Sequence, residues 1–127
     1  DIGIGNTYYW ALMMNNDPEK KPWAEATKVI LPTFEGGGTH VNLSGVLLAR
    51  NAPNKANALK LIEWLVGGQA QKIYADANYE YPIRAGVPVN PTIAGYGKLV
   101  ADPMPIAKII ASRKAAATLV DKVGFDN

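Results

Sequence analysis

Gly5-Asn6-Thr7-Tyr8-Tyr9-Trp10 is the stretch around which this 127-residue sequence is organised. Before it, Asp1 to Ile4 alternates apolar residues as the end of a strand does. Asn6 is a favourable helix N-cap, because its side-chain oxygen can accept a free amide of the first turn. The sequence therefore predicts that two tyrosines leave a strand-to-helix corner. Ligands of open α/β sheets bind at such corners, and a helix N-terminus suits an anion.

The adjacent tyrosines Tyr8 and Tyr9 have two interpretations. In the structural one, one ring packs inward and the other lies at the surface, because neighbouring helical residues point about 100° apart. In the functional one, the two phenols bind a metal. A trivalent cation deprotonates tyrosine well below its usual pKa of roughly 10, and Fe³⁺ prefers hard oxygen ligands such as phenolate. The tyrosine pair by itself leaves both interpretations open.

The composition is that of an ordinary globular domain, with 48% hydrophobic and 19% charged residues. The formal net charge is +2, and the thirteen Lys and Arg are spread from Lys20 to Lys122, which argues against nucleic-acid or anionic-membrane partners. The absence of cysteine excludes disulfides and thiolate chemistry. No apolar run reaches the ~20 residues of a membrane span. Because the sequence starts with neither Met nor a signal peptide, we expect a processed or partial chain.

The spacing of apolar residues and the positions of glycine and proline predict the secondary structure. Helices are predicted where apolar residues recur at intervals of three and four, in the ranges 7–14, 23–27, 54–66, 69–77 and 105–123. Gly124 is expected to end the last helix. Strands are predicted at 1–4, 28–32 and 41–50, where apolar residues run or alternate. The glycines at 36–38 predict a flexible turn or a crossing between lobes, and the range 82–103, rich in proline and glycine, predicts an irregular connection or hinge.

Common catalytic motifs are absent from the sequence. Gly3 to Tyr8 lies where a dinucleotide fingerprint would lie, but Tyr8 is too bulky for its third glycine position. There is no P-loop, nucleophile elbow or His-Glu-x-x-His pair. The single histidine, His40, cannot build a multi-histidine metal site, and we expect a loop imidazole satisfied by backbone groups. Large apolar side chains are expected to pack in the core, including Met13, Met14, Trp10, Trp23 and Trp64.

A second cluster of chemistry-bearing residues is Tyr79-Glu80-Tyr81. A carboxylate between two phenols is able to bind a ligand. The favoured interpretation is a helix exit that docks on the core with its phenol hydroxyls hydrogen-bonded.

Five stretches in chain order form a recognisable series: Asn6-Thr7-Tyr8-Tyr9, Gly38 to Val46, Asn54 to Leu65, Ala70 to Pro82, and Leu119 to Asp126. Together they resemble the periplasmic ferric ion-binding proteins of bacterial ABC importers. The resemblance implies an α/β, periplasmic-binding-protein-like (type II) bilobal fold, of which this chain is the C-terminal portion with lobe-crossing segments. Residues 1–40 would belong to the second lobe, 41–87 would return to the first lobe, and 88–127 would form a helical segment that packs on the second lobe.

The resemblance also implies the ligand and its residues. Tyr8 and Tyr9 would coordinate Fe³⁺, and Asn6 would help to hold a synergistic anion, carbonate or phosphate. The family's iron-binding histidine is not transferred to His40, which lies at the lobe crossing. The implied partners are the ferric ion, an inner-membrane ABC permease, and the missing N-terminal part of the same protein or a second chain.

Three functional hypotheses follow. The first is a non-enzymatic periplasmic carrier of Fe³⁺. The second keeps the fold but binds an organic anion such as a phosphonate, a polyamine or thiamine, with Tyr8 and Tyr9 as stacking or hydrogen-bonding groups. The third is a small hydrolase or transferase that uses Tyr79, Glu80 and His40, although no activated nucleophile and base can be paired.

Overall fold

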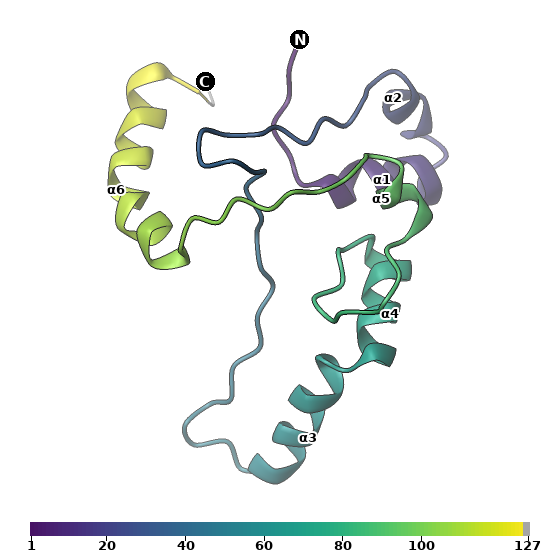
Figure 1. The fold of residues 1–127 in the computed structure, drawn as a ribbon, viewed down its shortest axis with the longest axis vertical. Helices are drawn as coiled ribbons and strands as arrows, with labels where there is room; N and C mark the ends of the chain where they lie inside the picture. The colour runs from purple at the N-terminus through teal and green to yellow at the C-terminus, as the bar shows by residue number, and fades with distance from the viewer. Residues whose placement is uncertain (126–127) are drawn as a thin grey trace. The chain divides into compact units, whose positions relative to one another are not determined.

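The computed structural model describes residues 1–125, which form six helices joined by extended connections (Figure 1). The helices are α1 (Thr7–Asn16), α2 (Lys21–Glu25), α3 (Lys55–Leu65), α4 (Gly68–Asn78), α5 (Pro91–Ala94) and α6 (Ile106–Val123). The described residues divide into two compact units. The first unit comprises Asp1–Leu31 and Asn42–Leu99, and the second comprises Pro32–Val41 and the chain from Val100.

Five of the six helices lie where the apolar spacing predicts them, and only the short α5, inside the predicted irregular connection, was not foreseen. Gly124 ends α6 with φ 61°, and its N–H bonds to the carbonyls of Asp121 and Val120, as predicted for a glycine cap. Tyr79 ends α4 in the same left-handed region, with φ 57°. A tyrosine tolerates that conformation less well than glycine does, because its Cβ crowds the following carbonyl.

The three predicted strands are wrong for this structure. The only β pairing in the described residues is an isolated parallel bridge between Thr39 and Ala101. Ile2 is 98% exposed and Leu47 is 94% exposed, so the apolar runs at 1–4 and 41–50 are not buried. A strand is stabilised by a hydrogen-bonded neighbour and by a covered face. The sequence pattern shows apolar character but not whether that neighbour belongs to the same chain.

The core of the first unit forms around α1. Ala11, Tyr79 and Ile93 are buried together, and Tyr8, Leu12, Tyr81 and Tyr96 pack against them. α1 also packs against α2, where the Trp10 indole Nε1 donates to the carbonyl of Ala24 at 3.1 Å. The Tyr79-Glu80-Tyr81 segment therefore docks on the core, as favoured from the sequence. Only one of its two phenol hydroxyls is hydrogen-bonded within the described residues: that of Tyr79 has a partner, whereas the buried hydroxyl of Tyr81 has none.

Large apolar side chains are exposed on the other helices. Neither α3 nor α6 has a buried residue. The predicted apolar face of α3 is only partly covered, because Ile62 and Leu65 are half-buried while Leu61 is 55% exposed. Trp23 and Trp64 are likewise exposed within the described chain, so the prediction that they pack in a core is wrong for this structure.

The turn at 36–38 is more restricted than its glycines predict. Thr39 N–H donates to Val100 O at 2.7 Å, and Asp102 N–H donates to Thr39 O at 2.8 Å. This pairing brings the Gly38 backbone so close to the backbone of Ala101 and Asp102 that a Cβ atom at position 38 would overlap it. The second unit therefore depends on a residue without a side chain at position 38.

Replacing Gly38 with Ala is expected to break the bridge between Thr39 and Ala101. The loss of stability should lie at the upper end of the about 1–3 kcal/mol typical of overpacking, because backbone atoms cannot move aside as a side chain tip does. Chemical denaturation of the complete protein measures this loss. Ala at Gly45, where nothing lies within 4 Å of the added Cβ, is the control. Equal stability of the two variants would contradict the prediction.

The predicted segments 1–40, 41–87 and 88–127 are not the same divisions as the two compact units. The last two residues of the third segment lie outside the described range. Compact units reflect contacts within this chain, whereas lobes are defined by the whole binding protein. The assignment of segments to lobes remains a prediction.

Candidate metal site

The beginning of α1 presents polar groups without a side-chain cap. Asn6 occupies the N-cap position with an extended backbone, as predicted, but its side chain makes no capping hydrogen bond. Its Nδ2 instead donates to the Tyr8 hydroxyl at 3.3 Å. The first turn contains no acidic residue. The amides at this helix end are therefore not occupied by a side-chain oxygen, and Asn6 lies beside the tyrosine pair.

The rings of Tyr8 and Tyr9 lie against each other. Their centroids are 4.4 Å apart and their planes are tilted by 53°. Tyr8 is half-buried against the core cluster and Tyr9 is 56% exposed, which agrees with the structural interpretation of one inner and one outer ring. The contact between the rings nevertheless keeps the two side chains on one side of the helix end. The structure thus brings together the three predicted site residues, Asn6, Tyr8 and Tyr9.

The pKa of Tyr8 is raised above its ordinary value. The main cause is a hydrogen bond with the Tyr9 side chain, followed by partial desolvation, the charge of Tyr9 and the Glu80 carboxylate, while the Asn6 amide acts in the opposite direction. Tyr8 is therefore a neutral phenol at physiological pH. A cation that binds it has to displace the proton.

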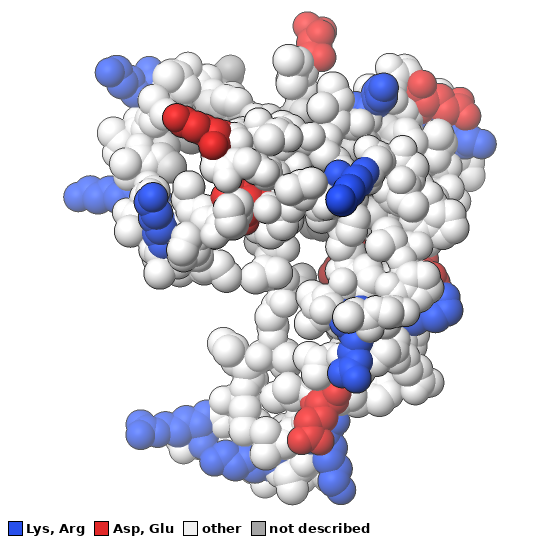
Figure 2. Space-filling model, viewed as in Figure 1, with Lys and Arg blue, Asp and Glu red and all other residues white. Residues whose placement is uncertain are grey.

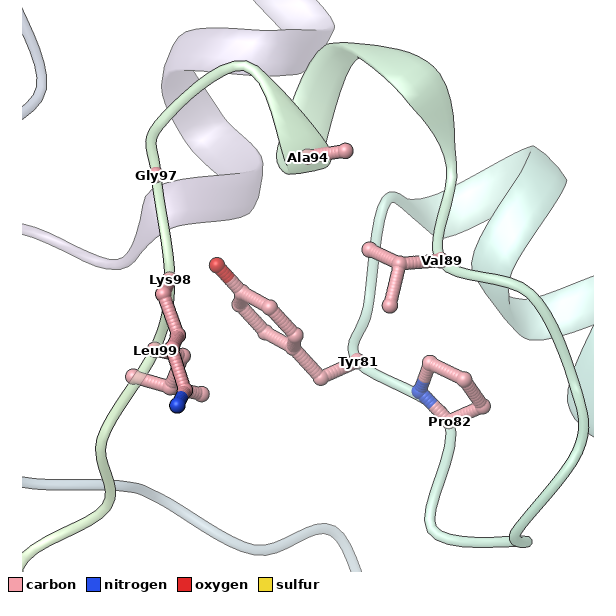
Figure 3. A pocket seen from close by; sticks show the side chains of 7 residues that line it. All are labelled: Tyr81, Pro82, Val89, Ala94, Gly97, Lys98 and Leu99. Atoms are coloured by element: carbon pink, nitrogen blue, oxygen red, sulfur yellow. The ribbon is translucent and has the colours of Figure 1, made fainter.

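Three further tyrosines belong to the core cluster on which Tyr8 packs. Tyr79 and Tyr96 use their hydroxyls within the protein: Tyr79 donates to Asn16 Oδ1 at 2.7 Å, and Tyr96 donates to the carbonyl of Thr7 at 3.1 Å. Tyr81 lines an open pocket with Val89, Lys98 and other residues, and Figure 3 shows its hydroxyl directed toward the chain at Gly97 and Lys98. Burial raises the pKa of Tyr81. These phenols are less available to a metal than those of Tyr8 and Tyr9.

The residues of the hydrolase hypothesis do not form a catalytic group. The hydroxyl of Tyr79 is bonded to Asn16, and Glu80 accepts a hydrogen bond from Asn78 Nδ2 at 3.4 Å. His40 is exposed and belongs to the other compact unit. Across residues 1–125, no three His, Cys, Asp or Glu side chains gather at one place.

Sequence reasoning missed two residues that hold the helix of the site, one at each end of α1. Tyr96 and Asn16 were not singled out, although both make hydrogen bonds that hold α1. These bonds join residues 89 and 63 positions apart in the chain. Neither spacing nor composition carries a signal for such pairs.

No protein-family model matches the chain. In sequence, it is 40% identical over 126 residues to iron uptake protein A1 of Synechocystis sp., covering 98% of this chain and 35% of that protein. In structure, it resembles the Bordetella ferric binding protein with a TM-score of 0.87 and 54% identity, covering 100% of this chain and 41% of the other. It also resembles Trichodesmium IdiA (FutA), solved in complex with iron and citrate ligands, with a TM-score of 0.86 and 38% identity, covering 98% of this chain and 40% of that one.

The chain has the fold of the corresponding part of a type II periplasmic binding protein. Within that fold it is related to the ferric ion-binding and iron uptake proteins, which confirms the resemblance found in the sequence. It spans only 35% to 41% of the length of the relatives named here. The predicted α/β class describes those larger proteins, and the described residues of this chain contribute mainly helices to it.

Proposed function

We propose that this chain supplies two phenolate ligands, Tyr8 and Tyr9, to a ferric ion site in the periplasmic solute-binding component of an ABC iron importer. The observation that supports this most is the contact of the two rings at the open N-terminus of α1, in a chain related to ferric-binding proteins. Phenolate oxygens are hard ligands that suit Fe³⁺. The protein is a carrier without catalytic activity, and the ion is its cargo.

An anion completes the site. Asn6 lies beside Tyr8, and the unpaired amides of the first turn of α1 attract negative charge. Carbonate or phosphate would fit this position, with Asn6 as a hydrogen-bond donor. A polycarboxylate such as citrate is a further candidate for this anion, because the Trichodesmium relative was solved with iron and citrate ligands.

The apolar faces of α3 and α6 are covered in the complete protein. The relatives contain more than twice the length that this chain spans, which leaves ample chain to pack against them. We expect the remaining Fe³⁺ ligands to come from that part, which corresponds to the missing N-terminal portion. The complete protein then delivers its ion to an inner-membrane permease. No helix within residues 1–125 combines the length and apolar character needed to cross a bilayer.

Ferric titration of the complete protein tests the proposal. Iron bound to phenolate is coloured, so adding a ferric chelate with carbonate, phosphate or citrate should produce a visible charge-transfer band that saturates at one ion per protein. Thermal-shift measurements with phosphonates, polyamines and thiamine test the alternative ligands. A colourless protein that carries no iron by elemental analysis would refute the ferric function.

Iron binding should release protons and weaken in acid. Because the raised pKa keeps Tyr8 protonated in the free protein, an ion that binds this phenol as phenolate has to displace its proton. Protons and Fe³⁺ compete, so the affinity falls as the pH is lowered. Titration with a ferric chelate in weakly buffered solution measures the release, after correction for the chelate's own protons. The variant with Phe at both positions is the control and should release none.

A further inference from the structure

Helix α1, which carries the tyrosine pair, accepts a hydrogen bond from another tyrosine at each of its ends. At the start of α1, Tyr96 Oη donates to the carbonyl of Thr7, the residue before Tyr8, at 3.1 Å. At the end of α1, Tyr79 Oη donates to Oδ1 of Asn16, the last helical residue, at 2.7 Å. Both donors come from segments distant in sequence but within the same compact unit.

Side contacts also restrict rotation of α1 about its axis. The Trp10 ring meets the Tyr96 ring edge-on, with centroids 5.6 Å apart. The same indole donates a hydrogen bond from Nε1 to the carbonyl of Ala24 at 3.1 Å. Asn15 Nδ2 donates to Thr92 Oγ1 in α5 at 3.1 Å. A helix held at its ends and its sides keeps the direction of its side chains, including Tyr8 and Tyr9.

The geometry points to Tyr96 and Tyr79 as positioning residues that hold α1 so that the Tyr8 and Tyr9 phenols are pre-organised for the metal. This inference rests on the proposed function. Neither residue needs to touch the ion. Metal sites require ligands held within about 0.5 Å of the productive geometry, which packing and outer-shell hydrogen bonds provide.

The chemistry of Tyr96 suits a positioning role rather than a ligand role. Burial, together with the neighbouring Tyr81, raises the pKa of Tyr96 to about 12. The hydroxyl therefore remains a hydrogen-bond donor at every pH at which the protein would handle iron. It neither loses its bond to Thr7 by ionising nor competes with Tyr8 and Tyr9 as a phenolate.

The backbone at Tyr79 is consistent with the same role. Tyr79 has a positive φ of 57°, the only such non-glycine residue in the described chain, and its ring is only 8% exposed. Such a conformation costs free energy and persists only where surrounding contacts enforce it. Here, the turn directs the buried phenol to Asn16. A glycine would end α4 with less strain but would leave Asn16 without this bond.

Removing single hydroxyl groups from the complete protein tests the inference. In Tyr96→Phe and Tyr79→Phe the rings remain, so the packing is preserved while one hydrogen bond to α1 is lost. We expect each variant to bind Fe³⁺ about 10–100-fold more weakly in competition with EDTA, as is typical for outer-shell partners of metal ligands. The charge-transfer band of the bound iron should also shift, because its energy depends on how the phenolates meet the ion.

Controls separate positioning from general stability. Tyr74→Phe, on α4, alters a half-buried tyrosine that has no hydrogen-bonded side-chain partner within the described residues and should bind iron as the parent does. Asn16→Ala removes the Tyr79 bond from the side of α1, so combining it with Tyr79→Phe should add little further loss. Variants that lose thermal stability but keep the parent's iron affinity and band would overturn the inference. A colourless parent protein would instead overturn the proposed function.

Discussion

The variant Tyr9→Phe is expected to lose most of the visible ferric band of the complete protein and to bind Fe³⁺ at least about 100-fold more weakly. The loss of a direct ligand should exceed the 10–100-fold loss of affinity that is typical when a residue that only supports a ligand is replaced. Tyr9 is 56% exposed, and within residues 1–125 its hydroxyl interacts only with Tyr8, so the substitution removes an oxygen without opening the core. Competition with EDTA and the absorbance of the bound ion measure the effect.

Tyr8→Phe should weaken iron binding by a similar amount but with a second consequence. The Tyr8 ring packs against the cluster of Ala11, Tyr79 and Ile93, and its hydroxyl accepts a hydrogen bond from Asn6. Phe keeps the packing and releases the Asn6 amide, so the dependence of iron binding on added anion should change as well. In Tyr9→Phe, by contrast, the anion dependence should persist at lower affinity.

The conservative change at Tyr74 serves as the matched control for both variants. Affinity and absorbance like those of the parent protein in Tyr8→Phe and Tyr9→Phe would show that the paired phenols pack rather than bind. The second hypothesis from the sequence, an organic ligand stacked on the same rings, would then gain support only if thermal shifts with that ligand were sensitive to these substitutions.

Glu80 acts on the tyrosine pair and not in a hydrolase site, which is the role that one hypothesis from the sequence gave it. Its negative charge contributes to the raised pKa of Tyr8. A carboxylate near the pair disfavours free phenolate in the absence of metal. The same negative charge attracts a cation, so Glu80 opposes ionisation of the empty site without opposing the loaded one.

Local features of the site could be predicted from the sequence, because they depend on neighbouring residues. Asn6 before Tyr8 and Tyr9 identified both the start of α1 and the candidate ligands, and Gly124 identified the end of α6. The strands at 1–4, 28–32 and 41–50 were wrong for this structure, since strand formation requires partners that the described chain does not provide. The Tyr96 bond to Thr7 could not be predicted, because it depends on how distant segments meet.

The apolar faces illustrate the same limit. The spacing of Leu61, Ile62 and Leu65 predicted an amphipathic helix, and α3 forms there. The spacing does not say what covers that face, and the described residues cover it only in part. An amphipathic pattern thus specifies an element and its orientation, whereas the core it joins depends on the remainder of the protein.

The variant Ile93→Ala is expected to destabilise the complete protein by about 2–5 kcal/mol, the range for truncating a fully buried isoleucine. Ile93 is 0% exposed and is the largest fully buried side chain among the described residues. Because α5 is short, its attachment to α1 depends on this side chain and on the bond between Asn15 and Thr92. Chemical denaturation with and without bound iron measures the loss.

A graded control distinguishes a cavity from a nonspecific defect. Ile93→Val removes one methylene and should cost only about 0.5–1.5 kcal/mol, whereas Ala leaves a space beside Ala11 and Tyr79. Because Tyr8 and Tyr96 pack on the same cluster, the Ala variant should also loosen the tyrosine pair and lower iron affinity even under conditions in which the protein remains folded. If stability fell as expected but iron affinity and the charge-transfer band stayed constant, the cluster would support the fold without setting the geometry of the metal ligands.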